Sequence, residues 1–327
     1  MTYSVGGLIQ ATDYNGFVST TAGANINATW STGATNSGWG QTAIGTVAAG
    51  GTVTATQWAS LVNTLSSMGS QTGTAITART APTTGTTIAV LAAVNTDITN
   101  CYTNRGNASG SGTPYGTFSG TTSQVNPTGS GQAAWTITFT HTVTFPSADQ
   151  ARYFFNAGGI VKLQYGKSST GTDTDPDWNT LAGWCGSINI TGGAQTIAAQ
   201  AYTGTTRLGG SGGTQTTLAT TTGWYNLIGS PTTIFQLTNS TAPYTGEYIR
   251  TTATATSTTV LTLVTTWVSD GSSGAGTTAD ISGGTATGSP STTITGTAPT
   301  TLVTYTPPSS TYLSASWGTP TIAASVA

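Results

Sequence analysis

The sequence between residues 135 and 145 reads Trp135-Thr136-Ile137-Thr138-Phe139-Thr140-His141-Thr142-Val143-Thr144-Phe145. Apolar residues, aromatic residues and one histidine alternate with threonine throughout this stretch. Because successive side chains of a strand point to opposite faces, the period of two predicts a β-strand with one buried face and one hydroxyl face. His141 falls on the apolar face, and we interpret it as a histidine of the core or of an interface.

The residues that follow predict a helix and then a second strand. Ser147 and Gln150 have the spacing of a capping box, which begins a short helix that runs through Phe155. The glycine pair at 158–159 ends that helix, since glycine readily takes the left-handed conformation of a helix C-cap. A new strand is predicted over Ile160–Tyr165.

Short runs rich in β-branched residues recur through the rest of the chain, separated by Gly and Ser turns. Tyr248–Thr256 and Val260–Val268 are joined only by a short turn, which predicts an antiparallel hairpin. The pattern predicts a mostly β fold with a small N-terminal helical region and a β-sandwich or barrel-like C-terminal part. The other predicted strands are Ser187–Thr191, Thr196–Tyr202, Thr233–Leu237, Leu302–Thr306 and Thr321–Val326.

The first part of the chain carries helix signals. Thr56 is predicted to cap a helix that ends at Gly69, and a similar helix start is predicted at Thr12. A third helical segment is predicted over Thr87–Tyr102. The apolar faces of these helices have two interpretations: the core of a small helical domain, or a contact surface between copies of the chain on which Asn95 fixes the register. The residues assigned to this oligomer or assembly surface are Tyr14, Phe17, Trp58, Leu61, Leu65, Ile88, Leu91, Asn95 and Ile98.

Changes in composition divide the chain into three regions. Residues 1–105 are predicted to form a helical attachment or assembly domain. Residues 106–131 are rich in Gly, Ser and Thr with few apolar anchors, which is typical of a linker. Residues 132–327 are predicted to form the β-rich domain, with a long surface loop at about 271–288.

The scarcity of charge limits the function classes. Only 5% of the residues are charged, against about 25% in an ordinary globular domain, so few groups can act as acids or bases. We therefore expect a structural or surface-binding protein and not an enzyme. The formal net charge of −2 and the scattered basic residues argue against a nucleic-acid partner. The longest apolar stretches are far shorter than a membrane-spanning helix, so no membrane span is predicted.

Two small groups of residues are candidates for other chemistry. Asp173, Asp175 and Asp177 alternate like the first ligands of a calcium loop, but Trp178 stands where that loop needs glycine, so a solvated loop is the alternative. With Glu247, the same aspartates are the carboxylates that a polysaccharide depolymerase would use. No cofactor other than this possible Ca²⁺ is expected.

Two further signals point to reduced thiols and to the absence of a serine nucleophile. Cys101 and Cys185 are predicted to be buried free thiols, as in proteins that fold in a reducing cytosol. Ser211 lies in a Gly-x-Ser-x-Gly pattern, but glycine and threonine surround it where a nucleophile elbow needs a strand and a helix. The first six residues contain no basic segment leading into an apolar one, so no secretory signal is predicted.

Several phrases of the sequence together resemble one group of viral proteins. They are Leu8–Asn15, Gly38–Gln41, Val53–Trp58, Tyr153–Gly159, Gly223–Leu227 and Glu247–Arg250. In these phrases the chain resembles structural proteins of tailed phages that infect cyanobacteria and other aquatic bacteria, in the tail-fibre or baseplate-associated class. The resemblance covers most of the chain and brings no set of catalytic residues with it.

The resemblance implies a virion component that is made in the host cytoplasm, is tail-associated and is oligomeric. We expect it to associate with itself, a trimer being favoured, and with other virion proteins, and to contact a host surface glycan. Alternatives are a carbohydrate-binding adhesin, a capsid decoration protein and a polysaccharide depolymerase. For the adhesin, the candidate exposed rings are Trp178, Trp184, Trp224 and Trp317.

Overall fold

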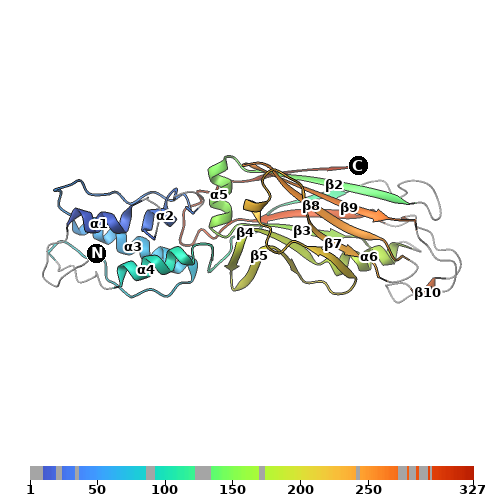
Figure 1. The fold of residues 1–327 in the computed structure, drawn as a ribbon, viewed down its shortest axis with the longest axis horizontal. Helices are drawn as coiled ribbons and strands as arrows, with labels where there is room; N and C mark the ends of the chain where they lie inside the picture. Colours follow the sequence, from blue (N-terminus) through green and yellow to red (C-terminus); the bar gives the residue numbers. More distant parts are fainter. Residues whose placement is uncertain are drawn as a thin grey trace.

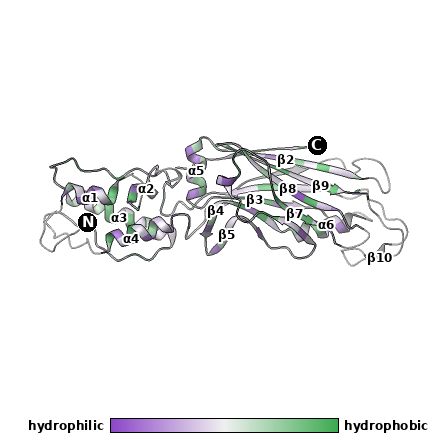
Figure 2. Ribbon diagram, viewed as in Figure 1, coloured by the Kyte–Doolittle hydropathy of each residue, from purple (hydrophilic) through white to green (hydrophobic). Residues whose placement is uncertain are grey.

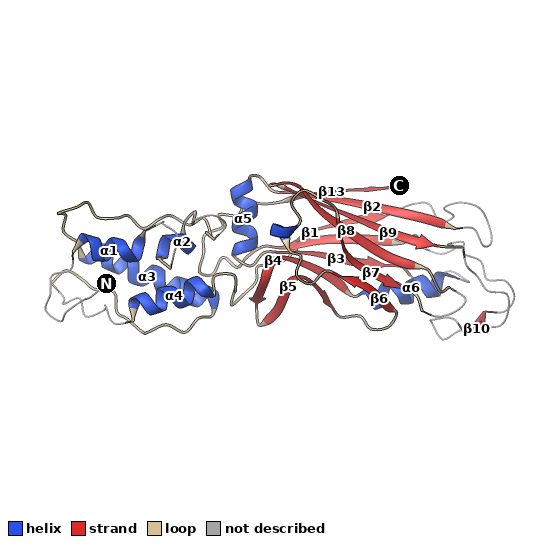
Figure 3. Ribbon diagram, viewed as in Figure 1, coloured by secondary structure: helices blue, strands red, loops and turns tan. Residues whose placement is uncertain are grey.

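The computed structural model describes residues 10–19, 24–33, 37–85, 93–121, 134–168, 174–240, 244–271, 278–279, 285–286, 294 and 297–327. A helical part and a β-sandwich lie end to end along the long axis of the molecule (Figure 1). Figure 3 shows helices α1 to α4 at one end of the molecule and the strands at the other. The prediction of a mostly β fold with a small N-terminal helical region is confirmed.

The helical part is held together by apolar side chains on facing helices. It comprises α1 (Ala11–Val18), α2 (Ile26–Trp30), α3 (Ala55–Thr72) and α4 (Val94–Thr103). The ring of Trp58 on α3 meets the ring of Tyr14 at 5.7 Å and that of Phe17 at 6.2 Å, both edge-to-face. Edge-to-face pairs at these distances are the favoured arrangement of aromatic rings.

Three predicted helix ends differ from the structure. The N-caps are Gln10 and Thr54 instead of Thr12 and Thr56, and Thr54 forms a complete capping box with Gln57. α3 continues past Gly69 and ends at Gly73, whose φ of 68° suits glycine. Gly69 has another role, because a Cβ there would lie only 3.1 Å from the side chain of Ile76. Helix α2 was not predicted.

The C-terminal part is an open sandwich of two antiparallel sheets, not a closed barrel. The first sheet has the order β1 (Tyr115–Thr121), β12 (Thr300–Thr306), β3 (Ile160–Gly166), β4 (Ser187–Ile197), β5 (Gln200–Leu208). The second has the order β13 (Thr321–Val326), β2 (Trp135–Thr144), β9 (Val260–Ser269), β8 (Tyr248–Ser257), β7 (Thr232–Thr238), β6 (Thr214–Leu218). Two short strands, β10 (Thr278–Ala279) and β11 (Thr285–Ala286), pair within the residues predicted as a long loop; the rest of that loop, apart from Gly271, lies outside the described residues.

The threonine-alternating stretch forms strand β2 as predicted. Its residues alternate between buried and more exposed positions, and it pairs with β9 along its whole length from Trp135 to Thr144. The β8–β9 hairpin is also confirmed. Helix α5 (Ala148–Asn156) begins as predicted, with the Ser147 hydroxyl accepting a hydrogen bond from the Gln150 amide at 3.2 Å.

One predicted strand was wrong. Residues 196–202 contain a turn at Ala198 and Ala199, which joins β4 to β5, so the segment is the tip of a hairpin. Both alanines have positive φ, of 48° and 64°. The turn carries no local signal, because Asn and Gly, not Ala, are the residues that favour this conformation. Strand β6 was not predicted either.

Helix α6 (Thr174–Cys185) fills the sandwich at the end farther from the helical part, where the figures place it against the strands (Figures 1 and 2). Trp178 lies 5.0 Å from Trp135 and 5.6 Å from Trp267, measured between ring centroids. The helix contacts β3 of one sheet and β8 of the other. Helix α6 therefore contacts both sheets, and its Trp178 packs on two tryptophans of the second sheet.

Candidate functional site

Residues of the segment predicted as a linker form hydrogen bonds with both the helical part and the sandwich. The Ser109 amide donates to the Gln71 carbonyl of α3 at 2.7 Å, and its hydroxyl donates to the Ser70 carbonyl at 2.6 Å. On its other side, the Ala108 amide donates to the Thr196 carbonyl of β4 at 2.8 Å. Residues 107–109 of the predicted linker thus contact both parts, and residues 115–121 form strand β1, which pairs with β12. Residues 122–131 of the predicted linker lie outside the described part of the chain.

Three buried glutamines also contribute to this junction, alongside the Arg152 guanidinium of α5, which donates to the Thr32 carbonyl at 2.9 Å. Gln41 donates to the Ser314 carbonyl at 2.9 Å and accepts from the Ser314 amide at 2.7 Å. Gln71 donates to the Ala157 carbonyl at the end of α5 at 3.2 Å. Gln195 of β4 donates to the carbonyls of Gly106 and Phe155, both at 2.8 Å.

We call these contacts of Gln41, Gln71, Gln195 and residues 107–109 the seam. All of its hydrogen bonds are between uncharged groups, and the glutamines are at most 8% exposed. Buried hydrogen bonds between two parts of a chain fix the angle between those parts, because breaking one bond leaves an unsatisfied polar group away from water. The seam therefore holds the two parts at a defined angle without using ion pairs.

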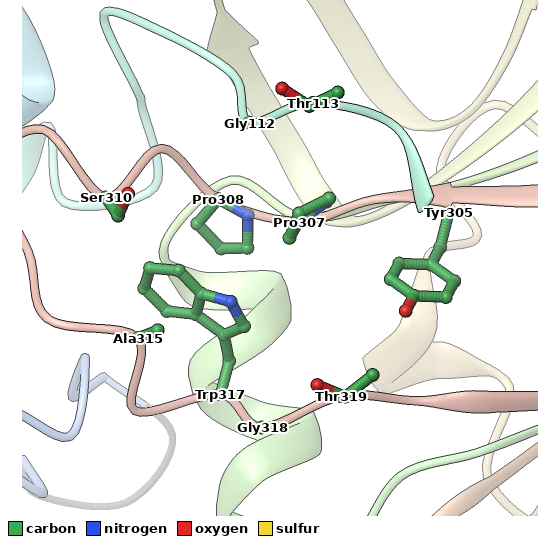
Figure 4. Close-up of a pocket in the computed structure, with 10 residues that line it drawn as sticks. All are labelled: Gly112, Thr113, Tyr305, Pro307, Pro308, Ser310, Ala315, Trp317, Gly318 and Thr319. Carbon is green, nitrogen blue, oxygen red and sulfur yellow. The ribbon is translucent and has the colours of Figure 1, made fainter. Parts of the chain in front are cut away.

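Two pockets open beside the seam and meet at Gly112. The first, of about 370 Å³, is shown in Figure 4. The indole of Trp317 lies across from Pro307 and Pro308, and Tyr305 stands at the far end of the cavity (Figure 4). Trp317 and Tyr305 are each only 4% exposed, and no charged residue is among the described residues that line this pocket.

The second pocket, of about 450 Å³, lies on the outer face of the first sheet. We call it the Lys162 pocket after its one charged residue. It is lined by Lys162 of β3, by Ser187 and Asn189 of β4, and by Tyr202 of the β4–β5 hairpin. The other described lining residues are Ser111, Gly112, Pro114, Ile160, Ile197, Ala198, Gln200, Leu208, Gly209 and Thr306.

None of the polar residues of the Lys162 pocket was predicted from the sequence as a site residue. Lys162 and Asn189 were predicted only to lie within strands, over Ile160–Tyr165 and Ser187–Thr191. They become neighbours because β3 pairs with β4 in the register that places Lys162 opposite Asn189. No local pattern indicates that register.

The residues predicted as an oligomer or assembly surface lie mainly in the interior of one chain. The described apolar members of the set are at most 1% exposed and belong to one hydrophobic core. Asn95 is exposed on α4. Ile88 and Leu91 lie outside the described residues. The buried members thus occupy the positions expected for the core of a small helical domain.

Two of the three predicted aspartates, Asp175 and Asp177, lie on helix α6. Asp177 lies within α6 and is fully buried, so the prediction of a solvated loop is wrong for this residue. Asp173 and the side chain of Asp175 lie outside the described residues. Glu247 is also fully buried and accepts a hydrogen bond from the Ser269 hydroxyl at 3.4 Å.

His141 and Ser211 occupy different environments. His141 is fully buried on the inner face of β2, as predicted, and burial lowers the pKa of its imidazole. Ser211 is exposed in the loop between β5 and β6. In that loop the ring of Trp184 lies against Gly212, where a Cβ would collide with it. Gly212 and Gly213 beside Ser211 therefore leave room for this tryptophan ring.

The remaining candidate rings and both cysteines are also inside the molecule. Trp178 and Trp224 are buried in the core, and Trp184 is half-buried. Cys101 and Cys185 are buried free thiols, as predicted. Burial, and then the nearby Asp97 carboxylate, raise the pKa of the Cys101 thiol to about 11. A thiol with so high a pKa holds almost no thiolate at neutral pH and reacts slowly.

Neither a metal centre nor a bilayer-crossing helix is found in the described part of the chain. It contains no group of three or more His, Cys, Asp or Glu side chains placed to hold one ion. None of its helices combines the length and the apolar character needed to cross a bilayer. Comparison of the sequence and the structure with protein-family models, curated proteins and solved structures finds no match.

Proposed function

We propose that this chain is a structural component of a tailed-phage virion, associated with the tail as part of a fibre, baseplate or tail tip. In this proposal the helical part attaches to other virion proteins and the β-sandwich faces outward, where it contacts the host. The copies of the chain associate with one another, and a trimer is the favoured state.

The seam is the observation that supports this proposal most directly. A protein that positions other proteins in a particle must keep its two ends at a fixed angle while the surrounding salt concentration changes. Salt screens interactions between exposed charges, whereas buried hydrogen bonds between uncharged groups are screened much less. The end-to-end arrangement and the uncharged seam meet both requirements (Figure 1).

The surface composition gives a second line of support. Among the described residues, the large apolar side chains that are well exposed are Ile228 and Tyr312. The outward faces of strands such as β2 and β12 carry threonine instead. Such a surface can form close contacts between subunits through shape and hydroxyl groups, without the charged residues that the chain lacks.

Mass spectrometry of purified virions tests this proposal. We expect peptides of the chain at a fixed ratio to the major tail proteins after density-gradient purification of the particles. The proposal is overturned if the chain is abundant in the infected-cell lysate but absent from the purified particles. Electron microscopy of particles that carry a gold-labelled copy then distinguishes a tail position from a capsid position.

Light scattering of the purified protein tests the oligomeric state. A trimer has three times the chain mass of 32.7 kDa. A mass equal to one chain at micromolar concentration would contradict the trimer.

A further inference from the structure

The Lys162 pocket carries an inference that goes beyond the proposed function and does not depend on it. Lys162 is half-buried on β3, and its cross-strand neighbours are Thr304 on β12 and Asn189 on β4. Lys162 forms no ion pair within the described residues, and no carboxylate is among the described residues that line the pocket. The pocket therefore presents a positive charge that this part of the chain does not neutralise.

Asn189 supplies a fixed acceptor next to this charge. Its amide nitrogen donates to the Ser187 carbonyl at 3.3 Å, to the Ser187 hydroxyl at 3.2 Å and to the Thr206 carbonyl at 3.3 Å. The side chain is 3% exposed, so these bonds hold the carboxamide in one orientation. Its Oδ1 accepts no hydrogen bond within the described residues and is left as an acceptor for a ligand hydroxyl.

The pocket wall offers an apolar surface with a polar edge. Tyr202 packs against a small apolar cluster of Ala108, Ile160 and Ile197, separate from the main core. Burial raises the pKa of its phenol, which keeps the hydroxyl protonated as a hydrogen-bond donor. A tyrosine ring of this kind combines a flat apolar face with a polar tip. Ser111 and Thr306 add hydroxyl groups at the rim.

The combination of one positive charge, hydrogen-bonding groups and an aromatic ring matches the chemistry of an acidic sugar. A hexuronic acid residue has one carboxylate, several hydroxyl groups and an apolar face of C–H groups. The volume of about 450 Å³ is within the usual range of about 300–1,000 Å³ for small-molecule pockets. A phosphate ligand fits less well, because phosphate sites use arginine forks or converging backbone amides, and the pocket offers one lysine.

We propose that the Lys162 pocket binds an acidic saccharide, with the ammonium group of Lys162 pairing with the sugar carboxylate. The Asn189 oxygen and the Tyr202 hydroxyl bind sugar hydroxyl groups, and the Tyr202 ring packs on the C–H face of the sugar. The β4–β5 hairpin, which projects from the sandwich near the helical part, forms one side of the site (Figure 1).

Calorimetric titration of the purified full-length chain tests this site. The probes are short oligosaccharides of glucuronic, galacturonic and mannuronic acid, with neutral glucose and mannose oligosaccharides of equal length as comparison. We expect at least one acidic probe to bind, its affinity to fall as NaCl is raised, and the neutral probes to bind at least tenfold more weakly.

Two variants locate the site. Lys162→Met keeps the apolar stem of the side chain and removes the charge, and we expect the affinity for the acidic probe to fall about 10- to 100-fold. Arg250→Met is the matched control, because it removes one positive charge from the outward face of the other sheet. We expect it to leave the affinity unchanged. Circular dichroism and the melting temperature establish that both variants fold.

Three results would overturn the proposal. They are no binding of any acidic probe at millimolar concentration, equal binding by folded Lys162→Met, and equal binding of a short glutamate peptide or of the neutral sugars. Because every measurement uses the isolated chain, these results are independent of whether the chain is found in virions. Absence from virions would overturn the proposed function and leave the saccharide site in place.

Discussion

The side-chain amide of Asn27 forms two backbone hydrogen bonds of the kind that a neighbouring strand would supply. Its nitrogen donates to the Ile44 carbonyl at 2.8 Å, and its oxygen accepts from the Ile44 amide at 3.0 Å. Asn15 binds Val47 in the same two-bond manner, both at 2.8 Å. The extended segment between Ile44 and Val47 has no strand partner in the described structure, and these two asparagines satisfy its backbone instead.

Asn27→Asp should destabilise the helical part. The carboxylate has no N–H group to donate to the Ile44 carbonyl and places a charge at a site that is 2% exposed, so we expect a loss of about 2 kcal/mol in unfolding free energy. Asn63→Asp, at an exposed position of α3, is the control and should change the stability little. Urea denaturation followed by circular dichroism measures both. Equal losses of unfolding free energy in the two variants would show that the two hydrogen bonds between Asn27 and Ile44 do not contribute to the stability.

His141 makes the stability depend on pH. Burial lowers the pKa of its imidazole below the ordinary value of 6.5, and a backbone hydrogen bond to Thr301 only partly opposes this shift. The unfolded chain therefore binds a proton more readily than the folded chain. The contribution of His141 is fully present above pH 6.5 and is lost as the pH falls below that value.

We expect the urea midpoint of the wild-type chain to fall between pH 7.5 and pH 5.5. His141→Leu should flatten this dependence, whatever its effect on the stability at pH 7.5, because the variant has no imidazole to protonate. The measurement that checks this is the urea midpoint as a function of pH, compared between the wild-type chain and His141→Leu. Parallel profiles would exclude His141 as the titrating group.

At the scale of elements, the β4–β5 hairpin has an unfavourable turn. Ala198 and Ala199 both have left-handed backbone conformations, which cost an L-residue with a Cβ about 1 kcal/mol or more each. The hairpin is nevertheless held in place, because the Ala198 amide donates to the Ala108 carbonyl at 2.9 Å and β4 pairs with β5 on both sides of its bulge. Tertiary contacts thus stabilise a turn that the local sequence does not favour.

The double variant Ala198→Asn/Ala199→Gly should be more stable than the wild type by about 1–2 kcal/mol, because Asn-Gly favours this turn. Thermal denaturation measures the gain. Ala323→Gly serves as control, because Ala323 is exposed on β13 with an ordinary φ, and glycine there should reduce the stability by about 0.5–1 kcal/mol. A loss of stability in the double variant would contradict the assignment of strain to this turn.

At the scale of the whole molecule, the seam determines whether the two parts unfold together. Gln41 connects the helical part to the loop after β12, and Gln71 connects α3 to the end of α5. Gln195 connects β4 to the end of α5. Two parts coupled in this way are expected to unfold in one cooperative transition.

The double variant Gln41→Ala/Gln195→Ala should separate the transitions. Removing both side chains leaves several backbone groups of the seam without partners, so the helical part should melt at a lower temperature than the sandwich. Differential scanning calorimetry measures this as a second peak. Gln164→Ala, on the outward face of β3, is the matched control and should keep a single transition. A single transition in the double variant would mean that other contacts couple the two parts.

Elements whose signals are local were predictable from the amino-acid sequence alone. The alternation in β2, the cap of α5 at Ser147, the β8–β9 hairpin and the burial of His141 each follow from side-chain periodicity or from a few adjacent residues. Such patterns are sufficient because backbone conformation and the alternation of faces are set over a few residues. They establish a mostly β chain with helices at its N-terminal end.

Which segments become neighbours, in contrast, follows from the three-dimensional fold. The order β12-β3-β4-β5 brings Lys162, Asn189 and Tyr202 to one pocket. The seam makes residues 107–109, at the start of a glycine- and serine-rich region, a structural connection. Asp177 is buried for the same reason, since α6 packs between two sheets built from distant strands. These features depend on contacts between residues far apart in the chain, and no pattern within a single segment records those contacts.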